Sequence, residues 1–70
     1  MMLVSRPDGA VEVQCELVDF SLHGLRIRHN SEDVIEGQEV RVFFSWGEIT
    51  TRVMWSGAVG SSYETGLRLF

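Results

Sequence analysis

Asp19-Phe20-Ser21-Leu22-His23-Gly24 lies between two runs in which apolar and polar residues alternate, residues 10–18 and residues 25–28. Asp and Ser side chains hydrogen-bond nearby backbone groups, and Gly adopts a positive φ without steric cost. The spacing of Asp19, Ser21 and Gly24 therefore predicts a sharp turn between two strands, with Gly24 at positive φ. The same spacing presents two polar side chains at the rim of a sheet, where they can contact a ligand.

Period-two alternation continues through most of the chain and predicts five clear strands: residues 10–18, 25–28, 40–46, 49–55 and 63–69. Gly47 is expected in a tight turn between two of them, residues 56–62 form a loop of small residues, and Gly66 marks a bulge. The side chains expected to face inward are Val11, Val13, Cys15, Leu17, Leu25, Ile27, Val40, Val42, Phe44, Trp46, Ile49, Thr51, Val53, Trp55, Tyr63, Thr65, Leu67 and Leu69. Regular turn signals between short strands favour a small antiparallel β-barrel or sandwich without a terminal helix.

The length and charge of the chain limit its class. Seventy residues are expected to form one domain, residues 1–70, with a thin core. Ten acidic and six basic residues give a net charge of −4, which disfavours binding to the phosphate backbone of DNA or RNA. No apolar run approaches the roughly 20 residues of a membrane span, and no signal peptide is recognised. We therefore expect a cytoplasmic protein without membrane insertion.

Catalytic and metal sites are not indicated. Ser21 has no base placed near it by the sequence, and no pair of carboxylates stands out, so we expect no enzyme and no cofactor. His23 and His29 lack metal-ligand spacing and are expected to be exposed. Cys15 lies among apolar strand positions, where a thiol packs as a small hydrophobic group.

Several large apolar residues fall on the faces opposite the inward series: Phe20, Leu22, Phe43, Met54 and Phe70. Contiguous exposed apolar surface usually marks an interaction site. A homodimer or a protein partner that docks on these residues is therefore a second expectation, and it does not require a ligand.

The motif Asp19-x-Ser21-x-x-Gly24, followed by Leu25-x-Ile27, resembles the second signature of the PilZ family, bacterial domains that bind cyclic di-GMP. The likeness continues in Gly37 before an alternating strand, in Val53-x-Trp55, and in the closing Gly66-Leu67-x-Leu69-Phe70, so that it covers residues 9–70. It implies a six-stranded antiparallel barrel that binds its ligand at one rim. The chain would then be a non-catalytic module of cyclic di-GMP signalling.

The resemblance also implies which residues form the site. Asp19 and Ser21 would contact a guanine edge or a phosphate, and Gly24 would let the backbone turn closely beneath them. The family's first motif, Arg-x-x-x-Arg, is missing before the first strand, where Arg6 is the one candidate. Cyclic di-GMP binding is therefore expected to be weak at best, and a ligand-independent interaction module is the alternative.

The two outward arginines after the turn have two interpretations. Arg26 and Arg28 can help to hold phosphates, or they can pair across the sheet with Glu12 or Glu16 on a solvated face. In either case the side chains are expected to point away from the core, because they alternate with Leu25 and Ile27.

Overall fold

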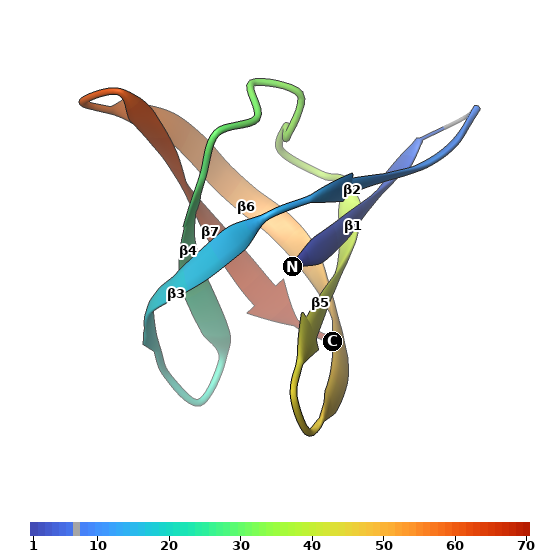
Figure 1. The fold of residues 1–70 in the computed structure, drawn as a ribbon. Coiled ribbons are helices and arrows are strands. Elements are labelled where there is room, and N and C mark those ends of the chain that lie inside the picture. The colour runs from blue at the N-terminus through green and yellow to red at the C-terminus, as the bar shows by residue number, and fades with distance from the viewer. Residues whose placement is uncertain (7) are drawn as a thin grey trace.

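The computed structural model describes residues 1–6 and 8–70, apart from the side chain of Arg6. The described part of the chain contains no helix, and hence none long and apolar enough to cross a membrane. Seven strands form one antiparallel sheet (Figure 1). They are β1 (Met2–Arg6), β2 (Gly9–Val13), β3 (Cys15–Phe20), β4 (Gly24–His29), β5 (Glu39–Phe44), β6 (Gly47–Val59) and β7 (Ser62–Leu69).

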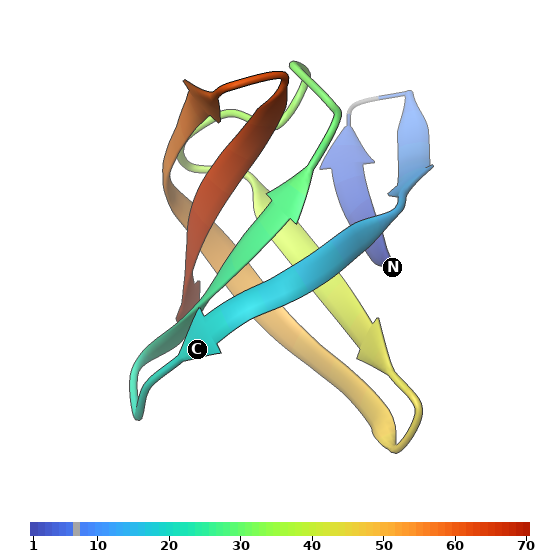
Figure 2. The ribbon, with the colours of Figure 1, turned by 60° about the vertical axis from the view of Figure 1, so that its left-hand side comes forward.

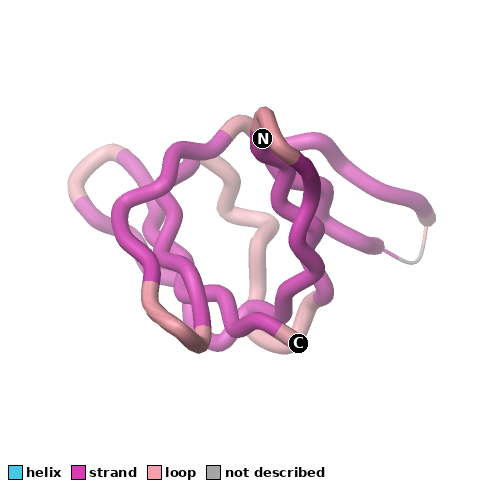
Figure 3. The backbone as a smooth tube through the Cα atoms, turned by 90° about the horizontal axis from the view of Figure 1, so that it is seen from below, coloured by secondary structure: helices cyan, strands magenta, loops and turns pink. Residues whose placement is uncertain are grey.

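The order of the strands in the sheet is β2-β1-β5-β6-β7-β4-β3. The two edge strands, β2 and β3, are consecutive in the chain and are separated by Gln14 alone. The sheet therefore curls until its two edges meet at one continuous segment, residues 9–20 (Figure 2), and the end-on view shows the resulting ring (Figure 3). Because no ladder joins β2 to β3 among the described residues, the barrel is not closed by hydrogen bonds.

The all-β antiparallel fold predicted from the sequence is confirmed, with seven strands instead of six. The predicted strand at residues 10–18 is extended but changes partner at Gln14: its first part pairs with β1 and its second with β4. The additional strand is β1, where the sequence analysis placed none. Met2 and Val4 are 0% and 1% exposed there and belong to the core. Two apolar residues at alternating positions are too short a pattern to predict a strand from the sequence.

The core lies inside the curled sheet and consists of Met2, Val4, Ile27, Val34, Val40, Val42, Val53 and Leu67, with Val13, Cys15, Leu25 and Phe44 packed against it. Together with the buried Thr51 and Thr65, these residues confirm eleven of the eighteen predicted inward positions, including the packing of Cys15. Val11 on β2 and Leu17 on β3 are exposed instead.

Two tryptophans expected inside are exposed. Phe44 pairs with Gly47, so Ser45 and Trp46 form the hairpin turn, and the Trp46 ring stacks on Phe44 with 5.1 Å between ring centroids. The ladder between β6 and β7 shifts register between Val53 and Trp55, which inserts one residue and reverses the alternation. Trp55 consequently points outward and is 46% exposed.

Residues 56–62 were predicted to be a loop, and that prediction is wrong. β6 continues to Val59 and pairs with β7 through the register Val59↔Ser62, which leaves Gly60 and Ser61 as the turn. Gly60 has φ of 60°, as a two-residue hairpin turn requires. Small side chains do not prevent strand pairing when the neighbouring strand continues alongside.

His29 is buried at 3% exposure, which contradicts the prediction of an exposed side chain. The Ser31 backbone N–H donates to its Nδ1 at 3.1 Å, so the neutral ring carries its proton on Nε2 and donates to Thr65 Oγ1 at 2.6 Å. Thr65 is hydrogen-bonded in turn to the Ser56 hydroxyl at 2.9 Å. Burial lowers the pKa of His29 below its ordinary value of 6.5, so the folded protein holds this ring neutral.

This network predicts a stability that depends on pH. Because the pKa of His29 is lower in the folded than in the unfolded chain, the unfolded chain binds more protons below pH 6.5. We expect the free energy of unfolding to fall by up to about 1.4 kcal/mol per pH unit as the pH decreases through this range. Urea denaturation at several pH values measures it. His29→Gln should remove this contribution and His23→Gln, at an exposed position, should retain it; equal slopes in both variants would contradict the assignment.

Candidate ligand-binding site

The outer face of the sheet carries a row of side chains that crosses four strands. The register aligns Asp19 on β3 with Arg26 on β4, Arg26 with Gly66 on β7, and Gly66 with Trp55 on β6. The shift at Met54 is what brings Trp55 to this face. Two charged residues, a glycine and a tryptophan therefore follow one another along a single row.

A second row lies beside the first. Gly24 on β4 is opposite Arg68 on β7, and Arg68 is opposite Arg52 on β6. Ser21 extends this row at the β3–β4 turn, since its backbone N–H donates to the Gly24 carbonyl at 2.9 Å. Ser21 and Gly24 therefore lie in one row with residues of β7 and β6, two strands that are distant from the turn in the sequence.

The two glycines at the centre of these rows are required by close contacts. A Cβ at Gly24 would overlap the backbone carbonyl oxygen of Leu67, and one at Gly66 would overlap the indole of Trp55. Gly24 does not have a positive φ, so the prediction of a left-handed glycine in this turn is wrong. Gly66 is regularly paired with Arg26, and the predicted bulge lies on the opposite strand, at Met54.

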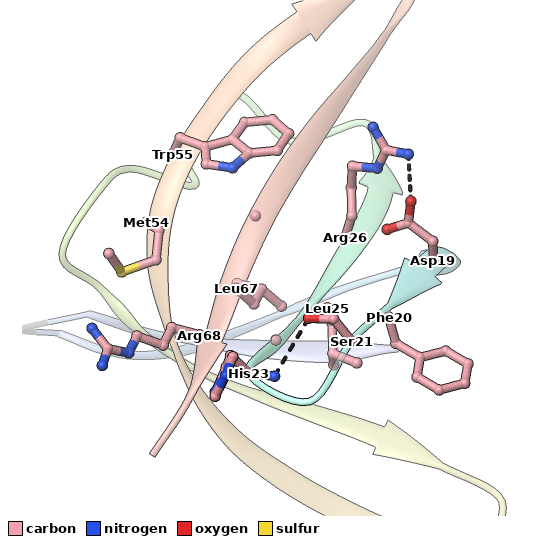
Figure 4. Close-up of a pocket in the computed structure, with 12 residues that line it drawn as sticks. Asp19, Phe20, Ser21, His23, Leu25, Arg26, Met54, Trp55, Leu67 and Arg68 are labelled. Carbon is pink, nitrogen blue, oxygen red and sulfur yellow. Dashed lines mark hydrogen bonds and ion pairs between the residues drawn. The ribbon is translucent and has the colours of Figure 1, made fainter.

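Both glycines line a groove of about 450 Å³, and Figure 4 shows the side chains around it. This volume is within the range of about 300–1,000 Å³ that is typical of small-molecule sites. Its lining residues are Asp19, Phe20, Ser21, His23, Gly24, Leu25, Arg26, Met54, Trp55, Gly66, Leu67 and Arg68. The structure therefore brings Asp19, Ser21 and Gly24 together in one concave surface.

Ion pairs hold the outward arginines of β4. Arg26 donates to Asp19 at 2.5 Å and lies 3.8 Å from Glu64, while Arg28 lies 3.0 Å from Glu64 and 3.7 Å from Glu16. The predicted pairing across the sheet is correct for Glu16, whereas the main partner, Glu64, comes from β7. Asp19 is thereby oriented along the groove and does not cap the turn.

The polar side chains of the turn keep hydrogen-bonding groups that the described part of the protein does not use. The Asp19 side chain is 58% exposed, and one of its two carboxylate oxygens makes the contact with Arg26. Ser21 Oγ accepts a long hydrogen bond, 3.4 Å, from the His23 backbone N–H, so its hydroxyl proton is free to be donated to a ligand. His23 itself is exposed, as predicted.

Arg6 was the remaining candidate from the sequence, and its side chain lies outside the described part of the structure. Its backbone ends β1, in a hairpin with β2 that points away from the β3–β4 turn in both ribbon views (Figures 1 and 2). Arg68, which sequence reasoning missed, lines the groove instead. The sequence contained a signal for it: Arg68 and Gly66 alternate with the positions predicted to face inward, Thr65, Leu67 and Leu69.

The outer face of the curled antiparallel sheet thus carries a groove of the size of a small-molecule site. The family model of the PilZ domain matches residues 1–70, and the chain belongs to this family, whose domains are modules of cyclic di-GMP signalling. No match was found among curated proteins or among solved structures.

The close contact beneath Gly24 predicts a local sensitivity to side-chain size. Gly24→Ala should destabilise the domain by more than the roughly 1 kcal/mol of an average point mutant, because the new methyl group meets the fixed backbone of β7. Gly57→Ala is the matched control, since nothing lies within 4 Å of its Cβ position. Thermal unfolding of both variants measures the difference. Equal melting temperatures would contradict the close approach of the Leu67 carbonyl to Gly24.

Proposed function

We propose that this chain is a non-catalytic module that binds cyclic di-GMP weakly in the groove, with Asp19, Ser21 and Gly24 as the half of the site that it retains. The observation that carries the proposal is the convergence of these three residues on one groove together with Arg26 and Arg68. Membership of the PilZ family supports the choice of ligand class.

The chemistry of the groove suits a guanine base. The free oxygen of Asp19 accepts from guanine N1–H or N2–H, and the Ser21 hydroxyl can donate to or accept from the base or a phosphate. Gly24 exposes backbone without a side chain above it, so a flat ligand can approach closely. Arg26 keeps the Asp19 carboxylate oriented before the ligand arrives.

Affinity is expected to be low, because residues 1–18 contain no Arg-x-x-x-Arg motif. Such arginines make charge-assisted hydrogen bonds worth about 1.5–3 kcal/mol each, so the loss of one or two weakens binding on the order of 10- to 10⁴-fold. The β1–β2 hairpin, in which Arg6 ends β1, points away from the β3–β4 turn (Figure 1) and is poorly placed to replace them.

Isothermal titration with cyclic di-GMP tests the proposal. We expect a Kd of roughly tens of micromolar or weaker in the native chain, by the contact energies above. Asp19→Asn should abolish the binding heat, and Asp8→Asn, at an exposed turn position, should leave it unchanged. Because exposed ion pairs contribute only about 0–1 kcal/mol, Asp19→Asn should remain folded, which urea denaturation can verify.

The alternative is a ligand-independent interaction module, and exposed apolar residues favour it. Phe20, Leu22 and Phe70 are 75%, 90% and 69% exposed, and Met54 is 45% exposed; Phe43, also expected on this surface, is half-buried. A homodimer or a protein partner could cover them. No heat with millimolar cyclic di-GMP, combined with self-association in analytical ultracentrifugation, would favour this alternative.

The cellular setting belongs to the same proposal. A cytoplasmic location in a bacterium fits a receptor of this ligand. The net charge of −4 supports the absence of DNA or RNA partners, because an acidic surface repels their phosphate backbones.

A further inference from the structure

We propose that Arg52 and Arg68 together bind a phosphate group of the cyclic dinucleotide, and so partly replace the missing arginine motif. This inference rests on the proposed function, because it names the side chains that would hold the charged part of that ligand. It assigns the phosphate to strands β6 and β7, which lie beyond the signature turn.

The first argument is the position of the two side chains. Arg52 and Arg68 are directly opposite each other in the β6–β7 ladder, both are exposed, and both are on the outer face. Like charges in directly opposite positions destabilise a sheet. An anion between the two guanidinium groups would convert this repulsion into attraction, and each planar group offers several donors to phosphate oxygens.

The second argument is the distribution of charge partners. The other described arginine side chains each have a carboxylate within ion-pair distance: Asp19 or Glu64 for Arg26, Glu16 or Glu64 for Arg28, and Glu48 for Arg41. Within residues 1–6 and 8–70, no ion pair is formed by Arg52 or Arg68, although the chain has more acidic than basic residues. Glu39 is opposite Arg52 on β5 and still makes no ion pair with it.

The third argument is the relation of this pair to the groove. Arg68 lines the groove next to the bare backbone of Gly24, and Figure 4 shows it at the side away from Asp19 and Arg26. The Arg52 guanidinium lies 5.3 Å from the ring centroid of Phe70, a cation–π contact that restricts its position. A ligand with guanine at Asp19 would therefore present its phosphate toward the unpaired cations.

Titration of three variants with cyclic di-GMP tests the inference. Arg68→Gln and Arg52→Gln should each weaken binding about 10- to 100-fold, the effect of losing one charge-assisted contact. Arg41→Gln is the matched control, because Arg41 is exposed on the same sheet and pairs with Glu48 away from the groove, and it should bind as the native chain does. The native affinity should also fall more steeply with salt than that of Arg52→Gln or Arg68→Gln.

The outcomes separate this inference from the proposed function. Dinucleotide binding that is unchanged in both Arg52→Gln and Arg68→Gln would overturn the inference and leave the proposed function standing. If the native chain does not bind the dinucleotide, the proposed function fails. A titration with inorganic pyrophosphate, monitored through the NMR signals of the arginine Nε–H groups, then tests whether Arg52 and Arg68 bind an anion. Shifts confined to Arg52 and Arg68 would support an anion site there, and their absence would overturn it.

Discussion

The structure depends on one continuous segment, residues 9–20, that provides both edges of the sheet. Its first half pairs with β1 and its second half with β4, so five strands must fit between two points that are separated by Gln14 alone. A flat sheet cannot satisfy this constraint, and the strands curl around the apolar core. The same segment leads directly into the β3–β4 turn, which places Asp19 and Ser21 at the rim.

Two glycines are among the residues that line the groove. Gly24 and Gly66 lie in adjacent rows of the outer face, and each is excluded from carrying a Cβ by a neighbour on another strand. Around them, Arg26 and Arg68 supply positive charge while Asp19 supplies a single acceptor. A site of this kind combines contributions from four strands, although a short motif in the turn is what identifies it in the sequence.

The sequence predicted the parts of the fold that local alternation controls. The inward positions of β4 and β5, such as Ile27 and Val40, follow from periodicity, and turn-forming residues indicated a turn within residues 19–24, which the structure has at residues 21–23. It could not predict features that depend on the neighbouring strand. The insertion at Met54 that turns Trp55 outward, the burial of His29 against Thr65, and the position of Arg68 beside Gly24 are set by pairing between strands. For the same reason, the sequence suggested that Gly24 is needed for a positive φ, whereas it is needed because the Leu67 carbonyl of the neighbouring strand lies close to it.

The strand order also has a consequence for the folding of the chain. β5, β6 and β7 form a meander joined by two-residue turns, so their pairing closes only short loops and costs little chain entropy. The pairings of β1 with β5 and of β4 with β7 join residues about forty positions apart, as in Met2↔Val42 and Gly24↔Arg68. The two outer hairpins are tethered to each other through Gln14, so docking of one onto the meander raises the effective concentration of the other at the opposite edge. Assembly of the last two pairings is therefore cooperative, and contacts that stabilise the pairing of β4 with β7 also favour the pairing of β1 with β5.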